Sequence, residues 1–156
     1  MIVAAGDFEV KAAGPTGPVI GVMPGRILTD HLRLSLPYRD GVRGCDLDQD
    51  VIKVAVIEGH GVNGNIGRAF VKGFGLKRGA IASSVGHDSH NICVVGASDA
   101  DMAFAANRLG EIGGGFVVVQ VTQHHAGALE EDAPHRAFAD HGAVGVDHVG
   151  QWIGHV

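Results

Sequence analysis

The sequence has little of what marks secreted, membrane-spanning or nucleic-acid-binding proteins. It holds only two cysteines, Cys45 and Cys93, and no CxxC pair, which excludes a disulfide framework and suits a reducing compartment. No apolar run approaches the roughly 20 residues that span a bilayer, and the N-terminal segment lacks the basic stretch and apolar core of a signal peptide. The net charge is -5, so no basic surplus is present to neutralise nucleic-acid phosphates. We therefore expect a soluble, cytoplasmic protein with neither a nucleic-acid nor a membrane partner.

Glycine is abundant instead, with 25 residues in a chain of 156, and 46% of the residues are hydrophobic. This composition is typical of a globular domain with a core and many turns. The first part of the chain reads as β-rich: the β-branched run 50–58 is the clearest strand, and 7–10, 19–23 and 27–36 are further candidates. The glycine- and asparagine-rich stretch 59–67 matches no phosphate-binding motif and predicts an ordinary turn.

The clearest helix is predicted over 98–112. Ser98 can act as its N-cap, and an apolar stripe at helical spacing consists of Met102, Ala105, Ala106, Leu109 and Ile112. Apolar runs at 92–96 and 116–119 flank the helix, so 92–119 predicts one βαβ unit with a right-handed parallel connection. The predicted fold class is α+β.

The composition changes abruptly after Gln120. Residues 121–156 contain six of the ten histidines and no lysine, and they show no strand or helix period. We therefore divide the chain into a domain over 1–120 and an atypical His- and Gly-rich tail over 121–156. A shifted reading frame or a disordered tail would each produce such a stretch.

A polar cluster lies between the strand-like runs 79–82 and 92–96. Its members are Ser83, Ser84, His87, Asp88, Ser89, His90 and Asn91. Loops on a rigid scaffold often carry binding and catalysis, so this cluster is the candidate site.

Three interpretations of the cluster stay open. The polar side chains can satisfy the backbone of a tight turn, or the loop can contact a ligand in an active site. His87, Asp88 and His90 are also good metal ligands, but a complete site needs more ligands, and His60 is the best-placed further candidate. Cys93 lies in an apolar strand, so we expect a small buried hydrophobe rather than a nucleophile.

The stretch from Gly73 to Asn91, GFGLKRGAIASSVGHDSHN, closely resembles the C-terminal domain of bacterial adenine deaminases. The similarity covers about 6–119 and includes the segments 6–8, 22–24, 29–32, 50–56, 94–96, 99–103, 107–109 and 112–119. The resemblance implies an amidohydrolase that converts adenine to hypoxanthine and ammonia. It also implies a divalent metal, manganese or iron, held by histidines and carboxylates inside a TIM barrel, where it lowers the pKa of the water that attacks purine C6. A neighbouring acid/base group would protonate the leaving nitrogen.

The catalytic TIM barrel is absent from this chain, since such a barrel needs at least about 200 residues. Its HxH metal motif is missing, and so is the HxE and PCxxC signature of the zinc deaminases. We therefore expect the chain alone to bind no catalytic metal and to be inactive, with an amidohydrolase barrel domain or subunit as its partner. Adenine would be the substrate of the complete enzyme, which we expect to be a homo-oligomer. A non-catalytic α+β binding or assembly domain and the remnant of a disrupted gene are the alternatives.

In the complete enzyme, the resemblance suggests that the loop from Ser83 to Asn91 faces the mouth of the barrel. His87, Asp88 and His90 would then contact the substrate or the metal-bound water, in a supporting catalytic role. Ser83, Ser84, Ser89 and Asn91 would shape the substrate loop. The isolated domain should also expose an apolar patch of more than a few hundred Å² where it packs against the barrel.

Overall fold

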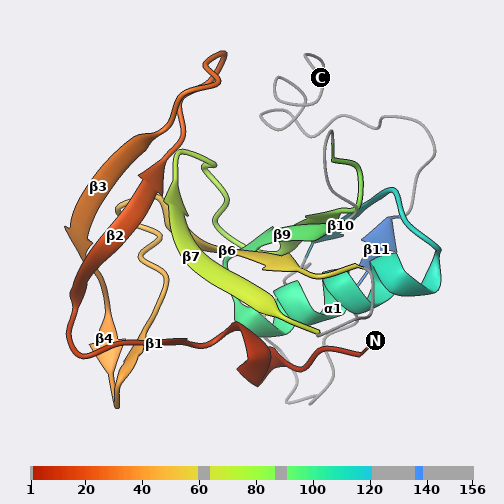
Figure 1. Cartoon of the computed structure of the whole chain (residues 1–156), viewed down its shortest axis with the longest axis horizontal. Helices are drawn as coiled ribbons and strands as arrows, with labels where there is room; N and C mark the ends of the chain where they lie inside the picture. The colour runs from red at the N-terminus through yellow and green to blue at the C-terminus, as the bar shows by residue number, and fades with distance from the viewer. Residues whose placement is uncertain (1, 60–63, 87–90, 121–135, 139–156) are drawn as a thin grey trace, which may run out of the picture.

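The computed structural model describes residues 2–59, 64–86, 91–120 and 136–138. Figure 1 shows a twisted sheet with α1 packed against one face and the hairpin of β2 and β3 diverging from one edge. The elements are η1 (Ala5–Phe8), β1 (Val10–Lys11), β2 (Thr16–Gly21), β3 (Asp30–Ser35), β4 (Tyr38–Arg39), β5 (Val42–Arg43), β6 (Val51–Ile57), β7 (Ile66–Lys72), β8 (Ala80–Ser83), β9 (Ile92–Gly96), α1 (Asp99–Glu111), β10 (Phe116–Gln120) and β11 (Arg136–Phe138).

The strands form a small sheet of order β1-β5-β4 and a large one of order β11-β10-β8-β9-β6-β7-β2-β3. This is the predicted α+β class, rich in strands. The βαβ unit is present as a split unit: β9 and β10 each pair antiparallel with β8, so they run parallel to each other with β8 between them. In the part of the chain that the structure describes, no helix is long and apolar enough to cross a bilayer.

Most predicted strands are confirmed, and two segments differ in part from the prediction. The runs 50–58 and 27–36 become β6 and β3, whereas 7–10 is divided between the end of the 3-10 helix η1 and the start of β1. The Asp7 carboxylate accepts a hydrogen bond from the Ala4 backbone N at 2.8 Å, which closes a local turn in place of an extended strand. The stretch predicted as a turn, 59–67, connects the antiparallel strands β6 and β7, but its last two residues, Ile66 and Gly67, already belong to β7. Residues 60–63 of this stretch lie outside the described residues.

Helix α1 is fixed at both ends by its own sequence. Ser98 is the N-cap, as predicted, and its Oγ accepts a hydrogen bond from the Asp101 backbone N at 3.2 Å. At the other end, the Gly114 N donates to the Leu109 carbonyl at 3.1 Å and the Gly113 N donates to the Gly110 carbonyl at 3.3 Å. These two bonds form a Schellman motif, and Gly113 supplies the left-handed residue that it needs, with φ of 82°.

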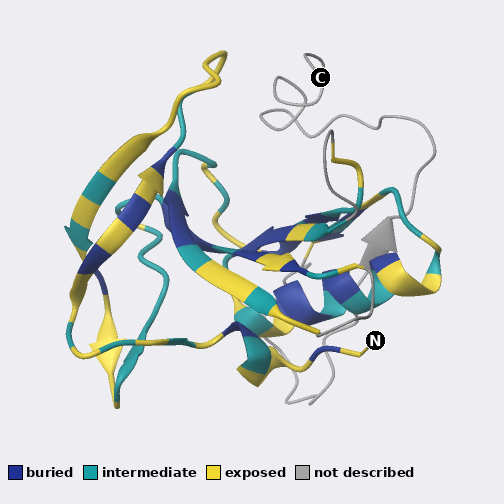
Figure 2. Ribbon diagram, in the orientation of Figure 1, coloured by how far each residue is buried: buried dark blue, intermediate teal, exposed yellow. Residues whose placement is uncertain are grey.

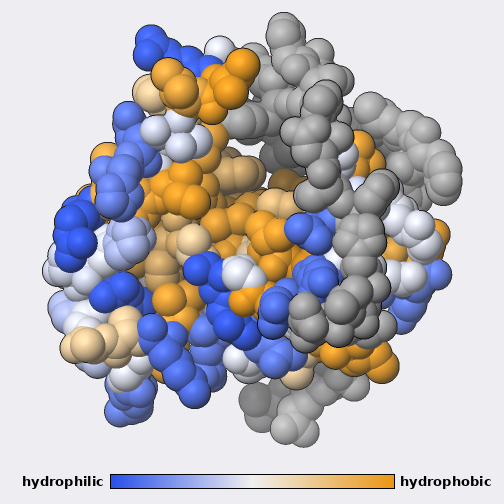
Figure 3. Space-filling view, viewed as in Figure 1, coloured by the Kyte–Doolittle hydropathy of each residue, from blue (hydrophilic) through white to orange (hydrophobic). Residues whose placement is uncertain are grey.

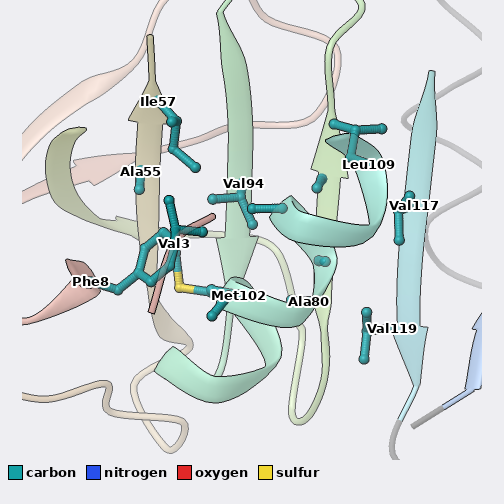
Figure 4. Close-up of a cluster of buried hydrophobic side chains, with 14 residues drawn as sticks. Val3, Phe8, Ala55, Ile57, Ala80, Val94, Met102, Leu109, Val117 and Val119 are labelled. Atoms are coloured by element: carbon teal, nitrogen blue, oxygen red, sulfur yellow. The ribbon is translucent and has the colours of Figure 1, made fainter. Parts of the chain in front are cut away.

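The main core lies between α1 and one face of the sheet (Figures 2 and 4). The predicted stripe of α1 is buried there; Met102 and Ala105 are 0% exposed. The facing strand residues are Ala55, Ile57, Ala80, Ala82, Val94, Val117 and Val119. The N-terminal segment closes this core, because the Asn107 side chain exchanges two hydrogen bonds of 2.9 Å with the Val3 backbone.

A buried ion pair joins the start of α1 to the middle of the sheet. The Lys53 Nζ lies 2.6 Å and 2.8 Å from the two carboxylate oxygens of Asp99, and Lys53 is only 5% exposed. Removing either partner would leave the other charge poorly solvated and unpaired. The pair therefore fixes the direction in which α1 leaves β9.

At Gly79, in the turn before β8, the backbone of β10 comes very close to the glycine. Its φ is 79°, and a Cβ at this position would lie 2.0 Å from the Val119 carbonyl oxygen. Gly75 has a similar φ of 67° but open space around it, so it is the matched control. We expect Gly75→Ala to lower the free energy of unfolding by about 1–2 kcal/mol through backbone strain alone. Gly79→Ala should cost roughly 1–3 kcal/mol more, because the backbone of β10 must move.

The free energy of unfolding of both variants is measured by urea titration, with circular dichroism as the signal. Equal losses of stability for the two substitutions would contradict the close packing at Gly79.

Candidate functional site

The candidate loop connects two neighbouring strands of the large sheet. It begins at Ser83, the last residue of β8, and ends just before β9, which starts at Ile92. His87, Asp88, Ser89 and His90 lie outside the residues that the structure describes, and so does the possible extra ligand His60. The structure therefore places both ends of the loop, and the roles predicted for these side chains stay predictions.

The described polar side chains of the loop hold its backbone. The Ser83 Oγ accepts a hydrogen bond from the Val85 N at 3.0 Å, and the Ser84 Oγ accepts one from the Gly115 N at 2.8 Å. At the other end, the Asn91 side-chain oxygen accepts a hydrogen bond from the Gly59 N at 3.4 Å. These hydrogen bonds fit the turn interpretation for Ser83, Ser84 and Asn91. The predicted contact of these residues with a substrate stays a prediction.

A row of partly exposed side chains crosses four strands beside this loop. The β-sheet register places Val56 of β6 opposite Cys93 of β9, Cys93 opposite Ser83 of β8, and Ser83 opposite Phe116 of β10. Val56 is 42% exposed and Phe116 is 41% exposed. Sequence reasoning missed this row, because it forms only when the register of four strands is known.

The row belongs to the sheet face that α1 does not cover. We call this face the open face, and its centre consists of the partly or largely exposed residues Ile20, Val54, Val56, Ile81, Ser83, Cys93, Phe116 and Val118. Figure 3 shows hydrophobic atoms lining a hollow beside the β2–β3 hairpin. Apart from Ser83 these residues are apolar, whereas the rim of the same face carries exposed polar side chains, His31 opposite Ile20 and Gln120 on β10. The centre of this face can therefore bury another nonpolar surface but offers little chemistry.

The prediction that Cys93 is buried is wrong, because its side chain points to the open face and is exposed. Its apolar surroundings still desolvate the sulfur, which raises the pKa of the Cys93 thiol. Desolvation by burial also raises the pKa of Cys45, although the nearby Lys53 ammonium partly opposes this. A raised pKa disfavours the thiolate, so neither cysteine is prepared for nucleophilic attack.

No metal-ligand set forms within the described ranges 2–59, 64–86 and 91–120, where no three His, Cys, Asp or Glu side chains lie close enough to share an ion. A separate open hollow of about 540 Å³ lies between η1 and the start of β7. It is lined by Ile2, Val3, Asp7, Gly64, Asn65, Ile66, Gly67 and Arg68. Its Asn65 carbonyl accepts a hydrogen bond from the Glu58 N at 3.0 Å, and the next residue, Gly59, donates to Asn91 of the candidate loop. The Arg68 Nε donates to the Asp7 backbone carbonyl.

The raised pKa of Cys93 gives a test of the open face. In a Cys45→Ala variant, we expect iodoacetamide to alkylate Cys93 more slowly at pH 8 than it alkylates a cysteine in a short peptide, since less thiolate is present. The rate should still be rising as the pH passes the ordinary thiol value of 9.0. A rate that levels off below this pH would mean a stabilised thiolate and would return Cys93 to the candidate nucleophiles.

Comparisons with known proteins agree with the resemblance in the sequence. Residues 26–129 match the model of the family "Adenine deaminase C-terminal domain". The adenine deaminase of Methylobacterium nodulans is 68% identical over 117 residues, which are 74% of this chain and 20% of the relative. Adenine deaminase 1 of Rhizobium meliloti is 63% identical over 117 residues, 75% of this chain and 21% of the relative.

The adenine deaminase of Gluconobacter oxydans is 55% identical over 144 residues, which are 88% of this chain and 26% of the relative. That match extends past residue 120, and β11 also lies beyond it, in a region where no strand was predicted. The chain spans only about a fifth to a quarter of the length of these relatives. It belongs to the adenine deaminase C-terminal domain family.

Proposed function

We propose that this chain works as the C-terminal domain of an enzyme that hydrolyses adenine to hypoxanthine and ammonia. The observation that carries the proposal is the 68% identity to an adenine deaminase over a segment that is only 20% of that relative. About four fifths of the relative lies outside the segment. The reacting groups of the enzyme belong, in this proposal, to that remaining part.

The chemistry of the described residues supports this division of labour. Hydrolytic deamination needs an activated water to attack C6 of the purine and an acid to protonate the leaving nitrogen. The centre of the open face offers apolar side chains and one hydroxyl, and the described residues group no three metal ligands. We therefore assign the divalent metal, manganese or iron, to the part of the enzyme outside this chain.

The loop from Ser83 to Asn91 contributes to the purine site from the side in this proposal. It starts beside the exposed row at Ser83, and its ends are held by the hydrogen bonds of Ser84 and Asn91. Anchored ends would let the intervening His87, Asp88 and His90 act as supporting groups near the substrate. The same proposal includes a cytoplasmic, homo-oligomeric complete enzyme acting in purine salvage.

A non-catalytic binding or assembly domain is the second candidate function. The open face favours it, because soluble monomers rarely leave a large contiguous apolar surface uncovered. The two candidates differ in whether replacing this domain changes adenine turnover.

The first test uses a hybrid enzyme, the Methylobacterium nodulans adenine deaminase with its matched segment replaced by the corresponding residues of this chain. We expect the hybrid with manganese to release ammonia from adenine, and this chain alone with manganese to release none. The unaltered relative is the positive control. Ammonia release by the chain alone would contradict the assignment of the chemistry to the remaining part. A folded hybrid without turnover would favour the binding domain.

The second test concerns the candidate loop in the same hybrid. We expect His87→Ala and Asp88→Ala to lower kcat by about tenfold or more, a loss in the range of single acid/base or positioning groups, while the melting temperature changes little. Ser84→Ala is the matched structural control, since it removes the hydrogen bond to Gly115 and should lower stability first. If all three variants lose stability and activity in the same proportion, the cluster is a structural turn.

A further inference from the structure

The β2–β3 hairpin carries an unusual tip. β2 and β3 pair through six residue pairs, but β2 pairs with β7 only at Ile20 and Gly21, so most of the hairpin stands free of the sheet (Figure 1). At its tip, Ile27 is 102% exposed and Leu28 is 79% exposed. Because these two adjacent aliphatic side chains are exposed, they add almost no hydrophobic burial to the stability of this domain.

The turn that presents these side chains has a defined conformation. The Arg26 N donates a hydrogen bond to the Met23 carbonyl at 3.2 Å, and Gly25 adopts a φ of 72°, which glycine tolerates best. Ile27 and Leu28 follow directly. The backbone therefore holds the apolar tip at a fixed place relative to β2.

The tip and the open face lie on the same side of the molecule. Figure 1 shows the hairpin rising on the side of the sheet away from α1, and the start of the β8–β9 loop rising on that side too. Val85, in that loop, is 62% exposed. The hairpin and the loop thus border the apolar hollow seen in Figure 3.

We propose that the open face and the hairpin tip, Ile27 and Leu28, together form the docking surface for the part of the adenine deaminase that lies outside this chain. The inference rests on the proposed function. It adds the surface through which this domain meets the rest of the enzyme. The centre of this surface carries no charged side chain, which is the composition of the buried core of a protein interface.

The occupant follows from the length of the relatives. About four fifths of the Methylobacterium nodulans enzyme lies outside the matched segment and belongs to the same polypeptide. Linkage in one polypeptide gives the two parts an effective concentration in the millimolar range, well above that of a second molecule. Helix α1 covers one face of the sheet. On the other face, Ile52, Val71 and Val95 are already buried by residues of this chain, Cys45, Leu47, Phe74 and Leu76 among them. The exposed apolar residues that remain there are the surface still to be buried.

Thiol labelling in the hybrid enzyme tests this docking. The Ile27→Cys substitution is made in the isolated chain and in the hybrid, and both proteins are labelled with a maleimide. The labelling rate at position 27 is measured by mass spectrometry of the peptide that contains it. We expect labelling to be about tenfold slower or more in the hybrid, which corresponds to about 1.4 kcal/mol of protection. Arg39→Cys is the control, because the Arg39 side chain is 93% exposed on β4, in the small sheet. Its labelling rate should be the same in both proteins.

Equal labelling of Ile27→Cys in the isolated chain and the hybrid would overturn the inference. Protection that appears in the isolated chain as its concentration rises would also overturn it, since the occupant would then be a second copy. Cys93 on the open face gives an independent readout in the hybrid without the Ile27 substitution, and it should be protected as well. Adenine turnover is measured on the same samples. Turnover without protection would contradict the docking surface but not the proposed function. Protection without turnover would contradict the proposed function but not the docking surface.

Discussion

The packing of α1 against one face of the large sheet is the interaction on which the rest of the structure depends. In the described part of the chain, α1 is the one α-helix, and its stripe of Met102, Ala105 and Leu109 is buried against the strands. A helix of 13 residues covers one face of such a sheet and leaves the other face to loops and solvent. This asymmetry creates both the core and the open face.

The position of α1 also determines where the candidate loop lies. The Lys53–Asp99 ion pair joins the helix start to β6, and the Schellman turn directs the chain from the helix end into β10. That turn brings Gly115 to Ser84, so the end of α1 supports the beginning of the β8–β9 loop. The loop is thus presented at an edge of the open face by contacts that belong to the core.

The sequence predicted those elements whose signals are local. The N-cap Ser98 and the apolar stripe identified α1, and the β-branched run of β6 identified the central strand. β7 was missed because Gly67 and Arg68 interrupt its apolar pattern. An exposed apolar patch was expected, but the residues that form it could not be predicted. The alternation along a strand separates its two faces and does not say which of them a helix covers. For this reason Cys93 was predicted to be buried. The row that it forms with residues of three other strands depends on how the strands are paired, which no local sequence pattern reveals.

We infer that the rest of an adenine deaminase covers the open face. Hydroxyl-radical footprinting with mass spectrometry tests it on the unmodified side chains of the isolated chain and the hybrid enzyme. Phe116 on the open face is 41% exposed, and Tyr38 on β4 is a matched aromatic control at 40%. We expect oxidation of Phe116 to fall sharply in the hybrid, while oxidation of Tyr38 stays unchanged. Equal oxidation of Phe116 in the isolated chain and in the hybrid would contradict it.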